Sequence, residues 1–168
     1  MVIGIYPGTF DPPTIGHMDI IRRSKSFCDK LIIAIGKNPT KTNSFPIEFR
    51  MRMIEKSMVE SGIIKNDRFG DFTISSFDGL LINYASKVGA NIIVRGIRSV
   101  SDFEYEINLA NVNKILQPSI ESIFLPTSPE LAVVSSSMVK EISKHGGDVS
   151  KFVSGDTLKF LNGLNFKK

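Results

Sequence analysis

The sequence contains one cysteine, two histidines and no tryptophan. The single cysteine, Cys28, excludes a disulfide within the chain. No apolar run approaches the roughly 20 residues that a membrane-spanning helix needs, and Met1 leads directly into an apolar segment rather than into a signal peptide. Histidine, cysteine, aspartate and glutamate nowhere show the spacing of a metal site. We therefore expect a cytoplasmic protein with no membrane partner and no metal-ligating residues of its own.

Basic residues exceed acidic ones only slightly, with a formal net charge of +4 and a sequence pI of about 9.2. They are spread along the chain apart from Arg22-Arg23 and Lys167-Lys168, whereas a nucleic-acid-binding protein usually shows a basic stripe. We therefore expect no nucleic-acid partner and favour small anionic substrates. The 168 residues, 42% of them hydrophobic, are enough for one core, so we predict a single domain over 1–168.

Short apolar runs alternate with helical patterns along the chain. Continuous apolar and β-branched residues predict strands covered on both faces over 2–6, 31–35, 72–75, 91–94 and 122–125. Apolar residues at helical spacing predict helices over 18–28, 47–58, 80–88, 103–114, 138–144 and 158–164. Cys28 is expected on the apolar face of the first helix, as a small core residue. This alternation predicts an α/β fold, a Rossmann-like doubly wound parallel five-stranded sheet with helices on both faces.

Polar residues and glycines follow four of the five predicted strands. They occupy 7–17, 37–44, 95–99 and 126–137. Because ligands of doubly wound sheets bind beyond the carboxyl ends of the strands, we predict that these four segments converge on one site.

The most specific of these segments is the turn after the first strand, which reads Gly8-Thr9-Phe10-Asp11-Pro12-Pro13-Thr14-Ile15-Gly16-His17. A glycine-bearing turn that enters a helix presents free N–H groups to an anion, which predicts a phosphate site. His17 would stabilise charge on a phosphoryl oxygen as imidazolium or, when neutral, by donating one hydrogen bond. Thr9 offers a hydroxyl in the same turn. The alternative for His17 is a satisfied histidine in the core.

Lys41 and two arginines bring positive charge to other strand ends. Lys41 is either a phosphate clamp or a solvated loop lysine. Arg95 and Arg98 flank Gly96, and their guanidinium groups suit phosphate oxygens. The alternative is a set of surface salt bridges with Asp102, Glu104 or Glu106.

Further candidates for nucleotide contact are one carboxylate and three serines. Glu106 either accepts from a sugar hydroxyl or an adenine amine, or is only a surface acid. Ser135, Ser136 and Ser137 precede a predicted helix, where one serine would suffice as N-cap. Three add hydroxyl and N–H groups at a positive helix end, which suits a polyphosphate tail. Simple capping stays the alternative, above all for Ser135.

Together, 6–17, the Lys41 loop, 95–98, 102–106 and 135–141 resemble the phosphopantetheine adenylyltransferases, a family of the nucleotidyltransferase superfamily marked by a T/H-x-G-H turn. Here that turn is Thr14-Ile15-Gly16-His17. The resemblance covers almost the whole chain and makes 1–168 a single nucleotidyltransferase domain. It implies in-line attack of the phosphate of 4′-phosphopantetheine on the α-phosphorus of ATP in coenzyme A biosynthesis, giving dephospho-coenzyme A and pyrophosphate without a covalent enzyme intermediate. It also implies Mg²⁺ carried on the ATP phosphates, a homohexamer, and coenzyme A as feedback inhibitor.

By this resemblance, His17 and Thr9 are catalytic residues that stabilise the transition state. The 4′-phosphopantetheine site would contain Thr9, Lys41, Leu81 and Arg95. The ATP site would contain Thr9, Phe10, His17, Gly96, Ile97, Arg98, Glu106, Leu131, Ala132, Val133, Val134, Ser135, Ser136 and Ser137. The sequence departs from the family pattern at Pro13 and Ile15 inside the turn, and at Leu131 and Val133, where aromatic residues are common.

Three other functions share parts of this pattern. A related nucleotidyltransferase would use nicotinate mononucleotide or an alcohol phosphate, and the stretch Glu104-Tyr105-Glu106 with the three serines argues against it. A fragment of a class I aminoacyl-tRNA synthetase shares the style of the turn, yet this chain lacks a basic stripe for tRNA. A non-catalytic nucleotide sensor would bind ATP without needing His17.

Overall fold

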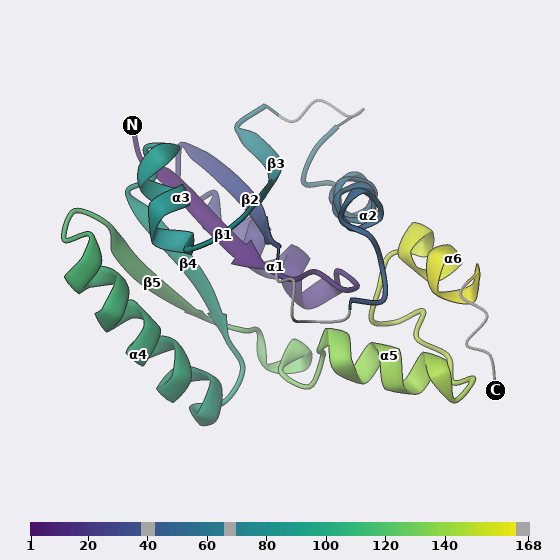
Figure 1. Cartoon of the computed structure of the whole chain (residues 1–168). Helices are drawn as coiled ribbons and strands as arrows, with labels where there is room; N and C mark the ends of the chain where they lie inside the picture. The colour runs from purple at the N-terminus through teal and green to yellow at the C-terminus, as the bar shows by residue number, and fades with distance from the viewer. Residues whose placement is uncertain (38–42, 66–69, 164–168) are drawn as a thin grey trace.

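The computed structural model describes residues 1–37, 43–65 and 70–163 (Figure 1). These residues form a five-stranded sheet with the order β3-β2-β1-β4-β5, and every neighbouring pair is parallel. The strands are β1 (Ile3–Gly8), β2 (Lys30–Gly36), β3 (Phe72–Phe77), β4 (Ile92–Ile97) and β5 (Glu121–Pro126). The helices are α1 (Ile15–Ser24), α2 (Ile47–Glu60), α3 (Leu81–Lys87), α4 (Val100–Leu116), α5 (Ser136–Lys144) and α6 (Gly155–Gly163), with a 3₁₀ turn at Pro129–Leu131. The predicted fold class is confirmed.

One face of the sheet is covered by α1 and α2. Ile20 of α1 and Ile54 and Met58 of α2 pack in one buried cluster with Ile33 and Ile35 of β2. Full burial of each such side chain stabilises the fold by roughly 1.5–3 kcal/mol. This layer fixes the position of α1, whose first turn borders the site described below.

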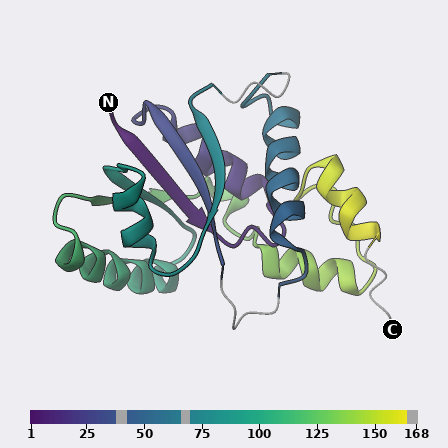
Figure 2. The same cartoon turned by 45° about the horizontal axis from the view of Figure 1, so that its top comes forward.

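The opposite face is covered by α3 and α4. Ile82 and Ala85 of α3 pack against Ile93 of β4. Phe103 of α4 packs edge-on against Phe124 of β5, with ring centroids 5.5 Å apart, and Phe124 is in register with Arg95 on the same face as Ile93. Figure 2 shows α3 and α4 on this side of the sheet and α1 and α2 on the other.

The helix predicted over 103–114 is present as part of α4, but its apolar stripe is not a core stripe. No residue of this helix is buried. Its exposed large apolar side chains are Val100, Phe103, Tyr105, Ile107, Leu109, Val112, Ile115 and Leu116. Helical periodicity predicts an apolar face but not which element covers that face. In this chain most of the apolar face of α4 is exposed to solvent.

A third cluster joins α5 and α6 to α2. Met53 of α2, Val139 of α5 and Leu161 of α6 are buried together with Phe45 and Val153. Figure 1 shows these two helices beside α2, past the carboxyl end of β1. Among the described helices, none is long and apolar enough to cross a membrane.

The ends of the first helix differ from the prediction. α1 begins at Ile15 and ends at Ser24, so it starts and stops earlier than 18–28. Cys28 is buried as expected, but it lies past the helix, where its Sγ would be 2.5 Å from a Cβ on Gly4. The thiol therefore fills the space left by a glycine of β1 rather than a position on a helix face. The last helix begins at Gly155, before the predicted 158.

Candidate active site

A pocket of about 300 Å³ lies at the carboxyl ends of β1 and β4. Residues from three of the four predicted segments line it, those after β1, β4 and β5. The lining residues are Tyr6, Pro7, Gly8, Thr9, Phe10, Thr14, Gly16, His17, Ile20, Arg95, Gly96, Arg98, Asp102, Glu106, Thr127, Val134, Ser135, Ser136 and Ser137. The fourth segment contains Lys41, which lies outside the described residues.

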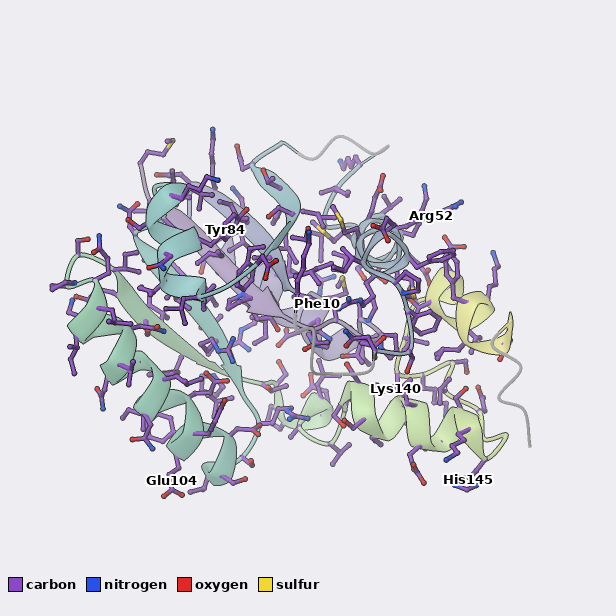
Figure 3. The ribbon with its side chains drawn as sticks, in the orientation of Figure 1. Phe10, Arg52, Tyr84, Glu104, Lys140 and His145 are labelled. Atoms are coloured by element: carbon purple, nitrogen blue, oxygen red, sulfur yellow. The ribbon has the colours of Figure 1, made fainter. Side chains whose placement is uncertain are left out.

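The turn after β1 is shaped around the ring of Phe10. Phe10 has a φ of 49°, in the left-handed region, and is buried against Tyr6 and His17, with ring centroids 5.5 and 4.9 Å away. A Cβ on Gly8 would lie 2.8 Å from the Phe10 ring, so only glycine lets the chain fold back this closely. Figure 3 shows Phe10 at the tip of β1.

His17 is held by the start of its own helix. Thr14 is the N-cap of α1 and its backbone N–H donates to His17 Nδ1 over 3.0 Å. The Thr14 hydroxyl lies 2.8 Å from the same nitrogen. Because a backbone N–H can only donate, Nδ1 carries no proton and Nε2 carries the ring's N–H. The histidine therefore lines the pocket as a neutral hydrogen-bond donor.

The surroundings of His17 keep it neutral. Burial, and after it the positive charge of Arg98, lower the pKa of His17 from 6.5 to about 4. Burial likewise raises the pKa of the neighbouring Tyr6 phenol above its ordinary value. Both side chains are therefore uncharged at neutral pH.

Each pocket arginine is paired with a carboxylate of α4. Arg95 forks onto Glu106, with Nε donating to Oε2 over 2.6 Å and Nη2 donating to Oε1. Arg95 Nη1 also donates to the Pro7 carbonyl over 3.2 Å. Arg98 Nε donates to Asp102 Oδ2 over 3.1 Å. The sequence left open whether these arginines form salt bridges or line a ligand pocket. In the structure they do both, and the carboxylates orient the guanidinium groups.

The three serines have different local roles. The hydroxyl of Ser135 is the N-cap of α5 and accepts from the Met138 N–H over 3.1 Å, so capping is confirmed for it. The Ser136 hydroxyl donates to the Pro12 carbonyl over 2.7 Å and ties α5 to the turn after β1. Ser137 is exposed at the pocket. The first turns of α1 and α5 therefore both border the pocket, and helix starts attract anions.

Several predicted residues do not line this pocket. Leu81 is the first residue of α3, and it packs against the buried cluster between α3 and the sheet. Ile97 does not line the pocket, although its neighbours Gly96 and Arg98 do. Before the serines, the predicted residues Leu131, Ala132 and Val133 also do not line it. Tyr6 and Thr127 also line the pocket, although neither is among the predicted site residues, and Asp102 was expected only as a possible salt-bridge partner. All three lie within or beside the predicted segments.

The chemistry of the pocket is that of an anion site. Its wall presents guanidinium groups, hydroxyls, an imidazole N–H and two helix starts, all of which suit phosphate oxygens. Within the described ranges, no three histidine, cysteine, aspartate or glutamate side chains form a group that could hold a metal ion.

Comparisons with known proteins agree with this chemistry. The cytidylyltransferase-like family model matches residues 5–142. A phosphopantetheine adenylyltransferase of Wolbachia pipientis subsp. Culex pipiens is 48% identical over 163 residues, which cover 97% of this chain and 93% of that protein. One of Caldanaerobacter subterraneus subsp. tengcongensis is 48% identical over 153 residues, 91% of each chain.

Solved structures share the fold at low identity. A Plasmodium falciparum nicotinic acid mononucleotide adenylyltransferase complexed with NaAD superposes with a TM-score of 0.66 and 15% identity over 98% of this chain and 96% of that one. A bifunctional NMN adenylyltransferase/ADP ribose pyrophosphatase from Francisella tularensis gives a TM-score of 0.72 and 20% identity over 96% of this chain and 49% of that one. These likenesses concern the fold alone.

Proposed function

The chain belongs to the phosphopantetheine adenylyltransferase family of nucleotidyltransferases, and we propose that it joins the adenylyl group of ATP to 4′-phosphopantetheine. The products are dephospho-coenzyme A and pyrophosphate, an intermediate step of coenzyme A biosynthesis. The observation that carries the proposal is one pocket in which His17, Arg95 and Arg98 meet the start of α5. We further propose that residues 1–168 act as one nucleotidyltransferase domain.

The reaction needs positioning more than it needs proton transfer. A phosphate oxygen of 4′-phosphopantetheine attacks the α-phosphorus of ATP in line, and the bond from that phosphorus to the bridging oxygen of pyrophosphate breaks. The nucleophile is already anionic, so no general base is required, and no covalent enzyme intermediate forms. The protein's task is to hold two anions at attacking distance and to stabilise the charge that shifts between them.

We assign the nucleotide side to Arg98, the α5 serines and His17. The helix start at Ser136 and the guanidinium of Arg98 suit the β- and γ-phosphates. The Nε2–H of His17 and the hydroxyl of Thr9 would donate to the oxygen on which charge develops at the α-phosphorus. Donors of this type contribute about 3–4 kcal/mol to lowering the barrier. Phe10, Gly96 and Val134, together with Ile97, Leu131, Ala132 and Val133 beside the wall, complete the proposed ATP site.

The acceptor side is assigned to Arg95, with Thr9, Lys41 and Leu81. Arg95 keeps donors free beside the carboxylate fork, and these suit a terminal phosphate. Glu106 is engaged by Arg95, so we propose that it orients this guanidinium in addition to bordering the nucleotide. The fork fixes the plane of the guanidinium before any substrate arrives.

Magnesium is proposed to enter with ATP rather than as a resident ion. The described pocket wall consists mainly of donors, and its carboxylates face arginines, which fits an ion coordinated chiefly by phosphate oxygens and water. When bound, Mg²⁺ neutralises part of the triphosphate charge. The donors named above would hold the phosphates in either case.

The homohexamer, inhibition by coenzyme A and a cytoplasmic location are proposed from the family resemblance. The exposed apolar face of α4 supports association of subunits, because single-chain proteins rarely expose so large an apolar patch. Coenzyme A contains the phosphopantetheine group, so it would compete for the acceptor side of the pocket.

The deciding experiment offers ATP and Mg²⁺ with one acceptor at a time and follows pyrophosphate release. We expect turnover with 4′-phosphopantetheine and none with nicotinate mononucleotide. Turnover with nicotinate mononucleotide alone would reject the substrate. Tight ATP binding without turnover on any acceptor would favour a nucleotide sensor. His17→Ala should lower kcat by orders of magnitude with little change in ATP affinity.

A further inference from the structure

Asp11 forms a buried junction behind the pocket that the mechanism above does not use. Its side chain is 3% exposed, and the residue does not line the pocket. Oδ1 accepts from the Phe45 N–H over 3.0 Å. Oδ2 accepts from the Ser44 N–H over 2.9 Å and from Lys140 Nζ over 2.9 Å. A carboxylate this deeply buried requires such a set of charged and N–H donors.

Asp11 and its three partners come from three parts of the proposed site. Asp11 lies two residues after Thr9 in the turn that leads to His17. Ser44 and Phe45 follow, along the chain, the segment that contains the predicted acceptor ligand Lys41. Lys140 is on α5, one turn after the serines of the nucleotide side, and Figure 3 labels it on that helix. One carboxylate thus ties acceptor, nucleotide and catalytic segments together.

Arg50 adds a second cation beside this junction, and unlike Lys140 it is buried. Its side chain is 2% exposed, and Nη1 donates to the Thr9 carbonyl over 2.7 Å. Its Nε is buried without a hydrogen-bond partner among the described residues. Burial lowers the pKa of Arg50, while the negative charges of Asp11 and then Glu48 act in the opposite direction. The Thr9 backbone is therefore tied to the same buried region as Asp11.

We propose that Asp11 and Lys140 are positioning residues for adenylyl transfer, setting the spacing between the acceptor and nucleotide halves of the pocket; this rests on the proposed function. In-line attack depends on alignment within about 1 Å, and such a misplacement costs about a hundredfold in rate. The pair touches neither substrate. Its loss should therefore appear in kcat more than in the affinity for ATP.

The test combines Asp11→Asn, Lys140→Met and the double variant with steady-state kinetics, ATP-binding calorimetry and thermal unfolding. We expect Lys140→Met and Asp11→Asn each to lower kcat about tenfold to a hundredfold, with the ATP dissociation constant changing less than threefold. The loss in the double variant should be smaller than the product of the single losses, because both changes break one contact. Lys140→Arg should restore most of the rate.

Lys25→Met is the matched control, since it removes a lysine–aspartate pair of the same 2.9 Å length on the surface. It should leave kcat unchanged. A purely structural pair would lower the melting temperature of Lys140→Met while kcat of the folded protein stays within twofold, and that result would overturn the proposal. Independent, multiplying losses in the double variant would overturn it as well.

Hydrogen exchange separates this proposal from the proposed function. The amides of Ser44 and Phe45 should exchange faster in Asp11→Asn and Lys140→Met than in the wild type. If the wild type itself releases no pyrophosphate with 4′-phosphopantetheine, the proposed function fails whatever the variants do. The role of Asp11 and Lys140 in holding these segments together is then tested by the exchange rates of the Ser44 and Phe45 amides. Unchanged protection of these amides in both variants would refute that role.

Discussion

The charge state of His17 is the feature of the site that a measurement can decide most directly. Its Nδ1 accepts the Thr14 N–H, and its pKa is lowered to about 4, first by burial and then by Arg98. At neutral pH the ring is therefore a neutral donor through Nε2. Protonation would place a proton on Nδ1, where the N-cap N–H already points.

The lowered pKa has a consequence for stability whose sign is fixed. In the unfolded chain the imidazole regains a pKa near 6.5, so on acidification the unfolded state takes up the proton before the folded state does. The free energy of unfolding therefore decreases as the pH falls from about 6.5 to about 4, and it does not decrease further from this cause below that range. At about 1.4 kcal/mol for each pKa unit, the loss reaches at most about 3.5 kcal/mol. That figure is an upper bound, because His17 is only partly buried where it lines the pocket.

Nuclear magnetic resonance can measure both the pKa and the tautomer. The chain has only two histidines, so His145→Gln leaves His17 as the single imidazole signal. We expect a titration midpoint near pH 4 and a protonated Nε2 with an unprotonated Nδ1 at pH 7. Thr14→Val is the matched control, because it keeps the backbone N–H and should preserve the tautomer. Equilibrium unfolding of wild type and His17→Gln at several pH values measures the stability difference.

Two results would refute this reasoning. A midpoint at 6.5 or above would mean that burial and Arg98 do not lower the pKa of His17, so that the imidazolium is populated near neutral pH. A proton on Nδ1 at neutral pH would mean that the capping contact with Thr14 does not hold the ring. The first result would make a cation available at position 17, and the second would take the ring's N–H away from Nε2, the nitrogen assigned as the donor to the reacting phosphate.

Two further perturbations test the packing around the site. Ile115→Glu places a charge on the exposed face of α4, and light scattering should show a smaller assembly than for the wild type, while Leu80→Glu, at an exposed apolar residue outside α4, should leave it unchanged. Gly4→Ala puts a Cβ 2.5 Å from the Cys28 Sγ and should destabilise by about 1–3 kcal/mol in urea unfolding, and adding Cys28→Ala should recover most of that loss. Simple additivity of the two losses would contradict the contact.

The order of strands and helices could be predicted because local patterns determine it. Continuous apolar runs mark strands that are covered on both faces, and all five lie where the sequence indicates. Helix boundaries were harder. The apolar periodicity of the first helix begins near Ile20, whereas the helix itself begins at Ile15 because Thr14 caps it and His17 returns the hydrogen bond. A capping interaction through a histidine has no familiar sequence signature.

The site could be predicted as segments but not as pairs. Polar residues after parallel strands meet at one edge of the sheet, so the segments after β1, β4 and β5 were found without coordinates. Whether Arg95 faces a phosphate or Glu106 depends on how α4 crosses β4, which no spacing reveals. The same holds for Asp11 and Arg50, whose burial depends on where α2 and α5 approach the turn.

These pairings change what limits catalysis in this pocket. His17 is neutral, and Arg95 and Arg98 are each anchored by a carboxylate before substrate arrives, so the donors pay little reorganisation when the transition state forms. A site built in this way gains rate from where its donors are held rather than from how much charge it carries. Substitutions behind the wall, at Asp11 or Lys140, should therefore lower kcat even though these residues touch no substrate, because they move the same donors relative to the reacting phosphorus.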